Sequence, residues 1–108
     1  MAYPAVELIE VPVFTRQSVE RWSAEEYRVF QLYLALRPDA GPVIPGSGGL
    51  RKVRWGLPGR GKRGGIRVIY YWKRATGQIF LLFLYPKNLR SDLTADQLQT
   101  LRKLVDDD

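Results

Sequence analysis

The fold class of this chain is set by residues 66–85, which read IRVIYYWKRATGQIFLLFLY. Two runs rich in β-branched and aromatic residues, Ile66 to Trp72 and Ile79 to Tyr85, flank a short turn segment around Ala75-Thr76-Gly77. This pattern predicts a β-hairpin. The second run is apolar or aromatic at every position, so we expect both of its faces to be buried and the strand to lie in the centre of a sheet.

Further elements are predicted upstream of the hairpin. Leu50 to Gly56 gives another strand. The alternation of apolar and polar residues from Ala5 to Phe14 predicts a first strand. Pro12 within it indicates that this strand lies at a sheet edge or ends early. Residues 16–22 have the length of one or two helical turns.

Two longer helices begin with capping boxes. Ser23 with Glu26 starts a helix that Pro38 ends. Thr94 with Gln97 starts a C-terminal helix. Each helix has one apolar face, made of Tyr27, Phe30, Tyr33, Leu34 and Leu36 in the first and of Leu98, Leu101, Leu104 and Val105 in the second.

The order of elements is strand, helices, three strands, helix. It predicts an α+β fold in which the N-terminal strand and the helices pack on a mostly antiparallel sheet, with a helix at the C-terminus. A chain of 108 residues supports one two-layer core, so we expect a single domain over residues 1–108.

The composition narrows the possible chemistry. The chain has no cysteine and no histidine, so disulfides, thiol chemistry, the usual zinc ligands and the usual near-neutral proton shuttle are all excluded. We therefore expect no metal and no cofactor. No signal-peptide pattern and no apolar run of about twenty residues occurs, so a cytoplasmic protein without a membrane partner is expected.

The positive charge is concentrated in the middle of the chain. The net charge is +6, and residues 40–91 hold eleven lysines and arginines and no acidic residue. Such a segment cannot neutralise itself locally, so it is expected to attract a polyanion or a strongly acidic protein segment. The alternative is a solvated basic face, which is the usual meaning of an isolated charge run.

Strand alternation selects a few of these cations. Successive side chains of a strand point to opposite faces, so Lys52 and Arg54 share one face. Ile66, Val68 and Tyr70 form the better core face of the next strand, and Arg67 then projects from the other face. Antiparallel pairing brings Arg67 near Lys52 and Arg54.

Other charged and aromatic residues surround this trio. The glycine-rich loop between the two strands carries Arg60, Lys62 and Arg63, while Lys87 and Arg90 follow the last strand. We expect Lys52, Arg54, Arg67 and Lys87 to line a basic pocket with Tyr71 or Tyr85 nearby. Cations bind phosphates and aromatic faces stack on unpaired bases, so this combination suits RNA.

Three segments together resemble the HigB-type toxins of the RelE superfamily, which are bacterial type II toxin–antitoxin proteins. They are PGSGGLRKVRW, GKRGGIRVIYYW and FLLFLYPKNLRSDLT. The resemblance implies a RelE-like microbial-ribonuclease fold and an mRNA interferase that cleaves messenger RNA in the ribosomal A site. It also implies a cognate helix-turn-helix antitoxin, through which the complex binds operator DNA. The chain departs from the pattern at Leu89 and Ser91, where relatives carry acidic residues, and its last helix has no tyrosine.

The resemblance assigns the basic pair to Lys52 and Arg54, the phosphate-binding arginine to Arg67, and the basic position after the last strand to Lys87. Metal-independent cleavage needs a base for the 2′-hydroxyl, a clamp for the phosphorane and an acid for the leaving oxygen. Crowding by cations disfavours a charged lysine, so Lys52 is the base candidate. Arg67 is the main clamp, Arg54 supports it, and Lys87 or Tyr85 is the acid candidate.

The remaining residues, Arg60, Lys62, Arg63, Tyr71 and Arg90, are predicted to bind RNA rather than to catalyse. Two rival functions stay open: a ParE-like gyrase poison, and a non-catalytic module that binds RNA or the ribosome. A gyrase poison would inhibit gyrase in a DNA supercoiling assay. A binding module would bind ribosomes without cutting the message.

Overall fold

A four-stranded sheet forms the centre of the molecule. The computed structural model describes residues 6–57, 65–88 and 92–105. The strand order is β1-β4-β3-β2, with β1 parallel to β4 and the other neighbours antiparallel. The bounds are β1 Glu7–Glu10, β2 Arg51–Trp55, β3 Ile66–Lys73 and β4 Gln78–Pro86. The predicted hairpin and the central position of its second strand are confirmed.

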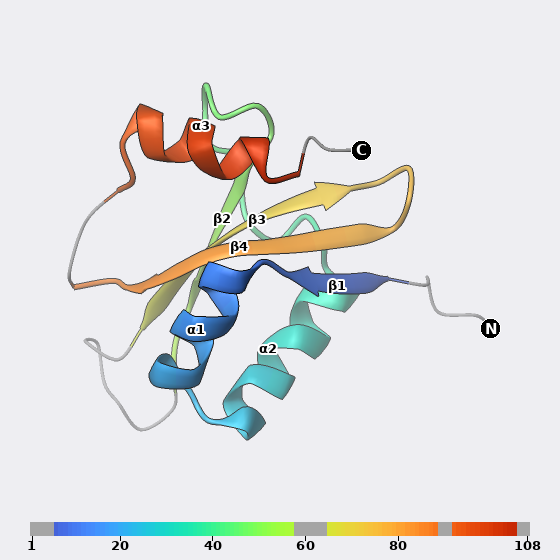
Figure 1. The fold of residues 1–108 in the computed structure, drawn as a ribbon. Helices are drawn as coiled ribbons and strands as arrows, with labels where there is room; N and C mark the ends of the chain where they lie inside the picture. The colour runs from blue at the N-terminus through green and yellow to red at the C-terminus, as the bar shows by residue number, and fades with distance from the viewer. Residues whose placement is uncertain (1–5, 58–64, 89–91, 106–108) are drawn as a thin grey trace.

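Helices cover both faces of this sheet. Figure 1 shows α1 (Pro12–Arg21) and α2 (Ala24–Leu36) on one face and α3 (Ala95–Lys103) on the other. Both predicted capping boxes are present: the side chains of Ser23 and Thr94 each accept from the backbone N–H of the third helical residue, whose side chain accepts from the backbone N–H of the cap. The α+β fold with a mostly antiparallel sheet is therefore confirmed. No helix in the described ranges is long and apolar enough to span a membrane.

The N-terminal strand lies at a sheet edge and ends before Pro12, as predicted, but its predicted extent to Phe14 is wrong. The first strand ends at Glu10, and Pro12 is the first residue of α1 rather than part of a strand that reaches Phe14. The first N–H groups of a helix have no intrahelical acceptor, so proline loses nothing at that position. Phe14 is fully buried, but it lies in α1 and not in a strand. Leu36 and Leu104 also differ from expectation, since both are largely exposed.

Two separate apolar clusters form on the two faces of the sheet. The cluster under α1 and α2 is dominated by aromatic and aliphatic side chains, namely Phe14, Trp22, Phe30, Leu34, Val53, Leu57, Ile66, Val68, Tyr70, Ile79, Leu81 and Leu84. The smaller cluster under α3 contains Leu50, Ile69, Leu82, Tyr85, Leu98, Leu101 and Val105. The face of β3 that carries Arg67 was expected to point outward, but Ile69 on that face is 1% exposed beneath α3. Only part of this face is therefore accessible.

A β-bulge in β4 decides which face receives Tyr85. Ile69 pairs with Phe83, and the next residue, Tyr70, pairs with Leu81, so Leu82 is an extra residue in the ladder. In a regular strand Ile79 and Tyr85 would share a face, because they are six positions apart. The bulge reverses the alternation, and Tyr85 joins the cluster under α3 while Ile79 stays under α1 and α2.

Candidate functional site

A row of polar side chains crosses three strands on the α3 face. Arg54 on β2 pairs with Arg67 on β3, and Arg67 pairs with Tyr85 on β4. Cross-strand partners point to the same face, so the three side chains lie side by side. Two arginines directly opposite each other repel and destabilise the sheet. An anion bound between them would relieve that repulsion, which identifies the row as a candidate anion site.

Burial increases along this row. Arg54 is exposed, Arg67 is half-buried, and Tyr85 is 5% exposed. The hydroxyl oxygen of Tyr85 is buried and makes no hydrogen bond within the described part of the chain. A buried hydroxyl without a partner costs free energy, and such groups in native proteins call for an explanation. A ligand oxygen would supply the missing partner once the groups that cover this hydroxyl move aside.

Lys52 lies beside the row and carries a partner that the sequence did not suggest. It pairs with Ile69, two residues along β2 from Arg54, and therefore shares the α3 face. Its Nζ atom donates a hydrogen bond of 2.6 Å to Oδ1 of Asp92, from the segment just before α3. The structure thus brings together Lys52, Arg54, Arg67 and Tyr85 as predicted, and adds a carboxylate to them.

The environment of Asp92 is strongly cationic. The hydrogen bond from Lys52 and the charge of Lys52 lower the pKa of Asp92 below its usual value, and the charges of Arg67 and Arg54 act in the same direction. The Asp92 carboxylate is therefore ionised at neutral pH. It also offsets the repulsion from Arg54 and Arg67, on which the base hypothesis for Lys52 depended.

Asp92 is the member of this candidate site that the sequence patterns did not predict. The chain holds no acidic residue from position 40 to position 91, and Asp92 is the first acid after that segment. Two residues later, Thr94 caps α3. The sequence shows Asp92 as an isolated acid between a long basic segment and a helix cap. Its partner Lys52 is 40 residues away, and their contact depends on how α3 packs on the sheet.

Lys87 continues the same face beyond the end of β4. Its backbone N–H donates to the carbonyl of Gly65, so the β3–β4 ladder extends one pair past Ile66 and Pro86. By alternation Lys87 follows Tyr85 on the α3 face, and its side chain is exposed. Lys87 thus lies next to the row, on the side of Tyr85, which agrees with its predicted position beside the basic pocket.

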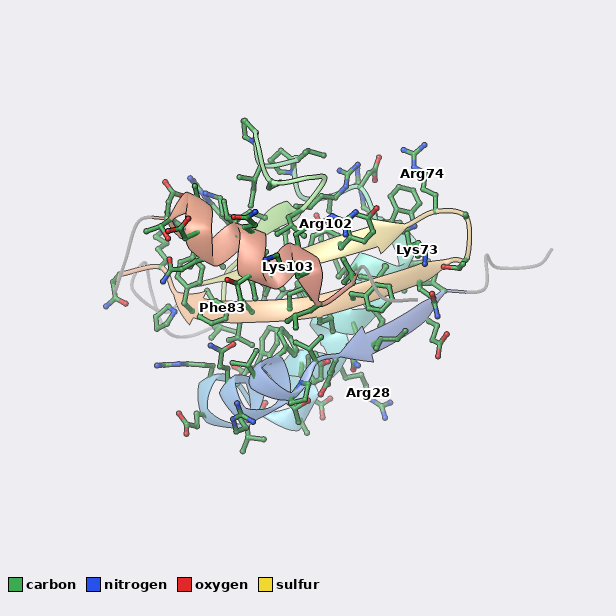
Figure 2. All side chains as sticks on the ribbon, turned by 45° about the horizontal axis from the view of Figure 1, so that its top comes forward. Arg28, Lys73, Arg74, Phe83, Arg102 and Lys103 are labelled. Carbon is green, nitrogen blue, oxygen red and sulfur yellow. The ribbon has the colours of Figure 1, made fainter. Side chains whose placement is uncertain are left out.

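Tyr71 lies away from these residues. Its ring is covered by the guanidinium of Arg102 at 4.5 Å, and the Arg102 Nε atom donates to the carbonyl of Gly48. A side chain at Gly48, where φ is +77°, would come within 3.2 Å of Arg102. Tyr71 therefore packs in a structural contact between β3, α3 and the loop before β2. Figure 2 shows Arg102 on α3, with Lys73 and Arg74 at the β3–β4 turn and Phe83 towards the opposite end of the sheet.

Four predicted RNA-binding residues cannot be placed. Arg60, Lys62 and Arg63 belong to residues 58–64, and Arg90 belongs to residues 89–91; both segments lie outside the described ranges. Elsewhere, Trp55 packs against Phe30 and Tyr33 in the core under α2. Within residues 6–57, 65–88 and 92–105, no three potential metal-binding side chains cluster.

Comparisons with known proteins agree with this architecture. Residues 12–107 match the family described as RelE toxin of the RelE / RelB toxin-antitoxin system. The fold is similar to that of an arginine-to-alanine double mutant of the E. coli toxin RelE in the free state, with a TM-score of 0.58 and 14% sequence identity. That similarity covers 97% of this chain and 99% of the E. coli chain. The family match spans nearly the whole sequence, so this chain belongs to the RelE family of toxins from toxin–antitoxin systems.

Proposed function

We propose that this protein is a ribosome-dependent mRNA interferase, an endoribonuclease that cuts messenger RNA in the ribosomal A site without a metal ion and so inhibits translation. The observation that carries the proposal is the row Arg54, Arg67 and Tyr85 with Lys52 beside it. Two guanidinium groups are suited to a phosphate, because they stay charged and donate in a fork geometry. The unpartnered Tyr85 hydroxyl provides a proton donor next to them.

The roles follow from the order of groups along the row. Arg67 is central, so we assign it to the scissile phosphate, with Arg54 as a second clamp on the exposed side. These donors would stabilise the charge that develops on the phosphorane. Tyr85, or Lys87 next to it, is placed to protonate the leaving 5′ oxygen. The base for the 2′-hydroxyl comes from the other side of Arg67, where Lys52 and Asp92 lie.

Dependence on the ribosome has a physical reason. A chain without histidine has no side chain that ordinarily titrates near neutral pH, so its proton transfers are unfavourable by themselves. A ribosome that holds the message bent, with the 2′-hydroxyl in line with the scissile bond, would lower the barrier by orienting the reacting groups. The basic segments 58–64 and 89–91, with Arg60, Lys62, Arg63 and Arg90, are proposed to dock on ribosomal or messenger RNA.

Within the RelE family, we propose that the chain is of the HigB type, because its three motifs resemble those of HigB-type toxins. A cognate helix-turn-helix antitoxin is therefore proposed as the neutralising partner, and operator DNA would be bound only through that complex. The toxin would act in the cytoplasm, where its target ribosomes are. A small reading frame for a helix-turn-helix protein beside the gene is the expected genetic arrangement.

Primer extension tests this function. A defined message is translated in vitro with the purified protein, and discrete cuts within codons are expected. The same message incubated without ribosomes should stay largely intact. An intact message in both reactions would overturn the proposal. Inhibition of DNA gyrase in a supercoiling assay would then assign the protein to the gyrase-poison branch, and ribosome binding without cleavage would indicate a binding module.

A further inference from the structure

Asp92 is positioned by the start of α3. Thr94, two residues on, caps the helix through a reciprocal pair of hydrogen bonds with Gln97. Leu98 and Leu101 bury α3 against the sheet. Because the helix start is fixed in this way, the carboxylate of Asp92 is held at Lys52 by packing as well as by charge.

The carboxylate is accessible. The side chain of Asp92 is 67% exposed, whereas that of Lys52 is 22% exposed. Oδ1 accepts the hydrogen bond from Lys52, which leaves Oδ2 to accept a second one. Within residues 6–57, 65–88 and 92–105, the charged groups that act on Asp92 are Lys52 and Arg54 from β2 and Arg67 from β3. All three are cations, so the carboxylate stays ionised in the pH range where ribosomes work.

Asp92 and Tyr85 lie on opposite sides of Arg67. Asp92 contacts the outer strand β2 through Lys52, Arg67 is on β3, and Tyr85 is on β4. Neighbouring strands are about 4.8 Å apart, so the backbones of β2 and β4 are separated by roughly 10 Å, with β3 and Arg67 between them. In-line cleavage needs its proton acceptor and its proton donor on opposite sides of the phosphorus. A phosphate held at Arg67 would have one of these groups on each side.

We propose that Asp92 is the general base of the cleavage reaction and that Lys52, which donates a hydrogen bond to it, orients the carboxylate. This assignment rests on the proposed ribonuclease function. Oδ2 of Asp92 takes the proton of the 2′-hydroxyl, and the 2′ oxygen attacks the phosphorus. The bond from phosphorus to the 5′ oxygen breaks, and that oxygen takes the proton of the Tyr85 hydroxyl. The products are a 2′,3′-cyclic phosphate and a 5′-hydroxyl, and water carries the proton from Asp92 back to Tyr85.

Lysine is the weaker candidate for this step. A lysine side chain ordinarily has a pKa of about 10.4, so only a small fraction of it is neutral at pH 7. The Nζ atom of Lys52 is also engaged in the 2.6 Å ion pair with Asp92, so it is not directed at a 2′-hydroxyl. A lysine that stays protonated can still hold the phosphate, as an arginine at the same position would.

The first test uses Asp92→Asn, with Asp96→Asn as the matched control on the first turn of α3, outside the site. Single-turnover cleavage of a ribosome-bound message is measured for both variants and for the wild type. Loss of a general base costs about 100-fold to 10,000-fold, so the rate of Asp92→Asn should fall at least 100-fold. Asp96→Asn should cleave like the wild type. Asp92→Glu keeps the carboxylate and should recover part of the rate, which a loss of fold would not allow.

The second test is the pH dependence of the wild-type rate. An ionised Asp92 as base predicts a rate that is flat between about pH 6 and pH 8, whereas a lysine base predicts a tenfold rise with each pH unit. A tenfold rise per unit, or an Asp92→Asn variant that cleaves at or above the wild-type rate, would overturn the assignment while leaving the ribonuclease function intact. A wild-type protein that does not cleave at all would overturn both.

Discussion

The two faces of the sheet each contain a buried tyrosine, and the hydroxyl groups of these two tyrosines differ in their hydrogen bonds. Under α1 and α2, the hydroxyl of Tyr70 donates to the carbonyl of Pro38 at 2.7 Å and accepts from the N–H of Gly41 at 2.9 Å. Under α3, the hydroxyl of Tyr85 has no hydrogen-bond partner among the described residues. Both side chains are at most 5% exposed. The difference therefore lies in the hydrogen bonds and not in burial.

The same contrast extends to the charged and polar groups. On the first face, the indole of Trp22 donates to Ser18 and the hydroxyl of Tyr27 donates to Glu10. On the second face, Arg54 and Arg67 oppose each other across two strands. Satisfied polar groups stabilise a fold, and repelling or unpartnered ones cost stability. The polar groups named on the α1/α2 face thus stabilise the fold, whereas on the α3 face the Tyr85 hydroxyl and the paired arginines cost stability.

The largest effect is expected for Arg67→Ala. Removing one preorganised donor typically lowers the rate about 100-fold to 1,000-fold, so this variant should no longer arrest growth when it is induced. Antitoxin binding should persist. Arg74→Ala is the matched control, because it removes the same charge from the β3–β4 turn, where Arg74 stacks on Trp72. Growth arrest by Arg67→Ala would place the reaction elsewhere.

Tyr85→Phe separates function from stability. Loss of the proton donor should slow cleavage by about 100-fold or more. The unfolding free energy should stay within about 0.5 kcal/mol of the wild type or rise, because the variant removes a buried hydroxyl that has no partner. Chemical denaturation beside the cleavage assay measures both. A variant that is destabilised yet fully active would show that the two tyrosines do not differ in role.

Tyr70→Phe should give the opposite result. It leaves the N–H of Gly41 without its acceptor and removes the hydrogen bond to Pro38, so the unfolding free energy should fall by about 1–3 kcal/mol. The cleavage rate of the folded fraction should be unchanged. Urea denaturation gives the first quantity, and single-turnover cleavage at low temperature gives the second. A slower reaction without destabilisation would extend the functional region to the α1/α2 face.

The smallest effect is expected for Arg102→Met, which tests the limit of the site along the α3 face. The variant loses a cation–π contact with Tyr71, worth about 0.5–1 kcal/mol, and a hydrogen bond to Gly48. A modest loss of thermal stability with normal cleavage would confirm that Tyr71 is structural. Reduced cleavage would return Tyr71 to the RNA-binding residues that the sequence predicted.

The parts of the molecule that follow local rules could be predicted from the sequence. Alternation placed Lys52 and Arg54 on one face, and the capping boxes at Ser23 and Thr94 fixed two helix starts. Pro12 correctly indicated an edge strand that ends early, but the helix that begins at Pro12 was not predicted, because a proline can end a strand or begin a helix.

Other features depend on contacts between distant segments. The bulge at Leu82 has no sequence signal, because IFLLFLY is apolar whichever face each residue takes. Regular alternation along β4 would place Tyr85 on the same face as Ile79, under α1 and α2, which is not the face it occupies. The pairing of Asp92 with Lys52 likewise depends on the docking of α3, which a reading of strands and helices one at a time does not provide.

The ends left on the message test the central claim most directly. Ribosomes carrying a defined message are incubated with the purified protein, and the chemistry of the new ends is determined at each cut. Attack by the 2′ oxygen predicts a 2′,3′-cyclic phosphate on one fragment and a 5′-hydroxyl on the other. A 3′-hydroxyl with a 5′-phosphate would mean that water attacked the phosphorus, and it would contradict the roles assigned to Arg67, Tyr85 and Asp92.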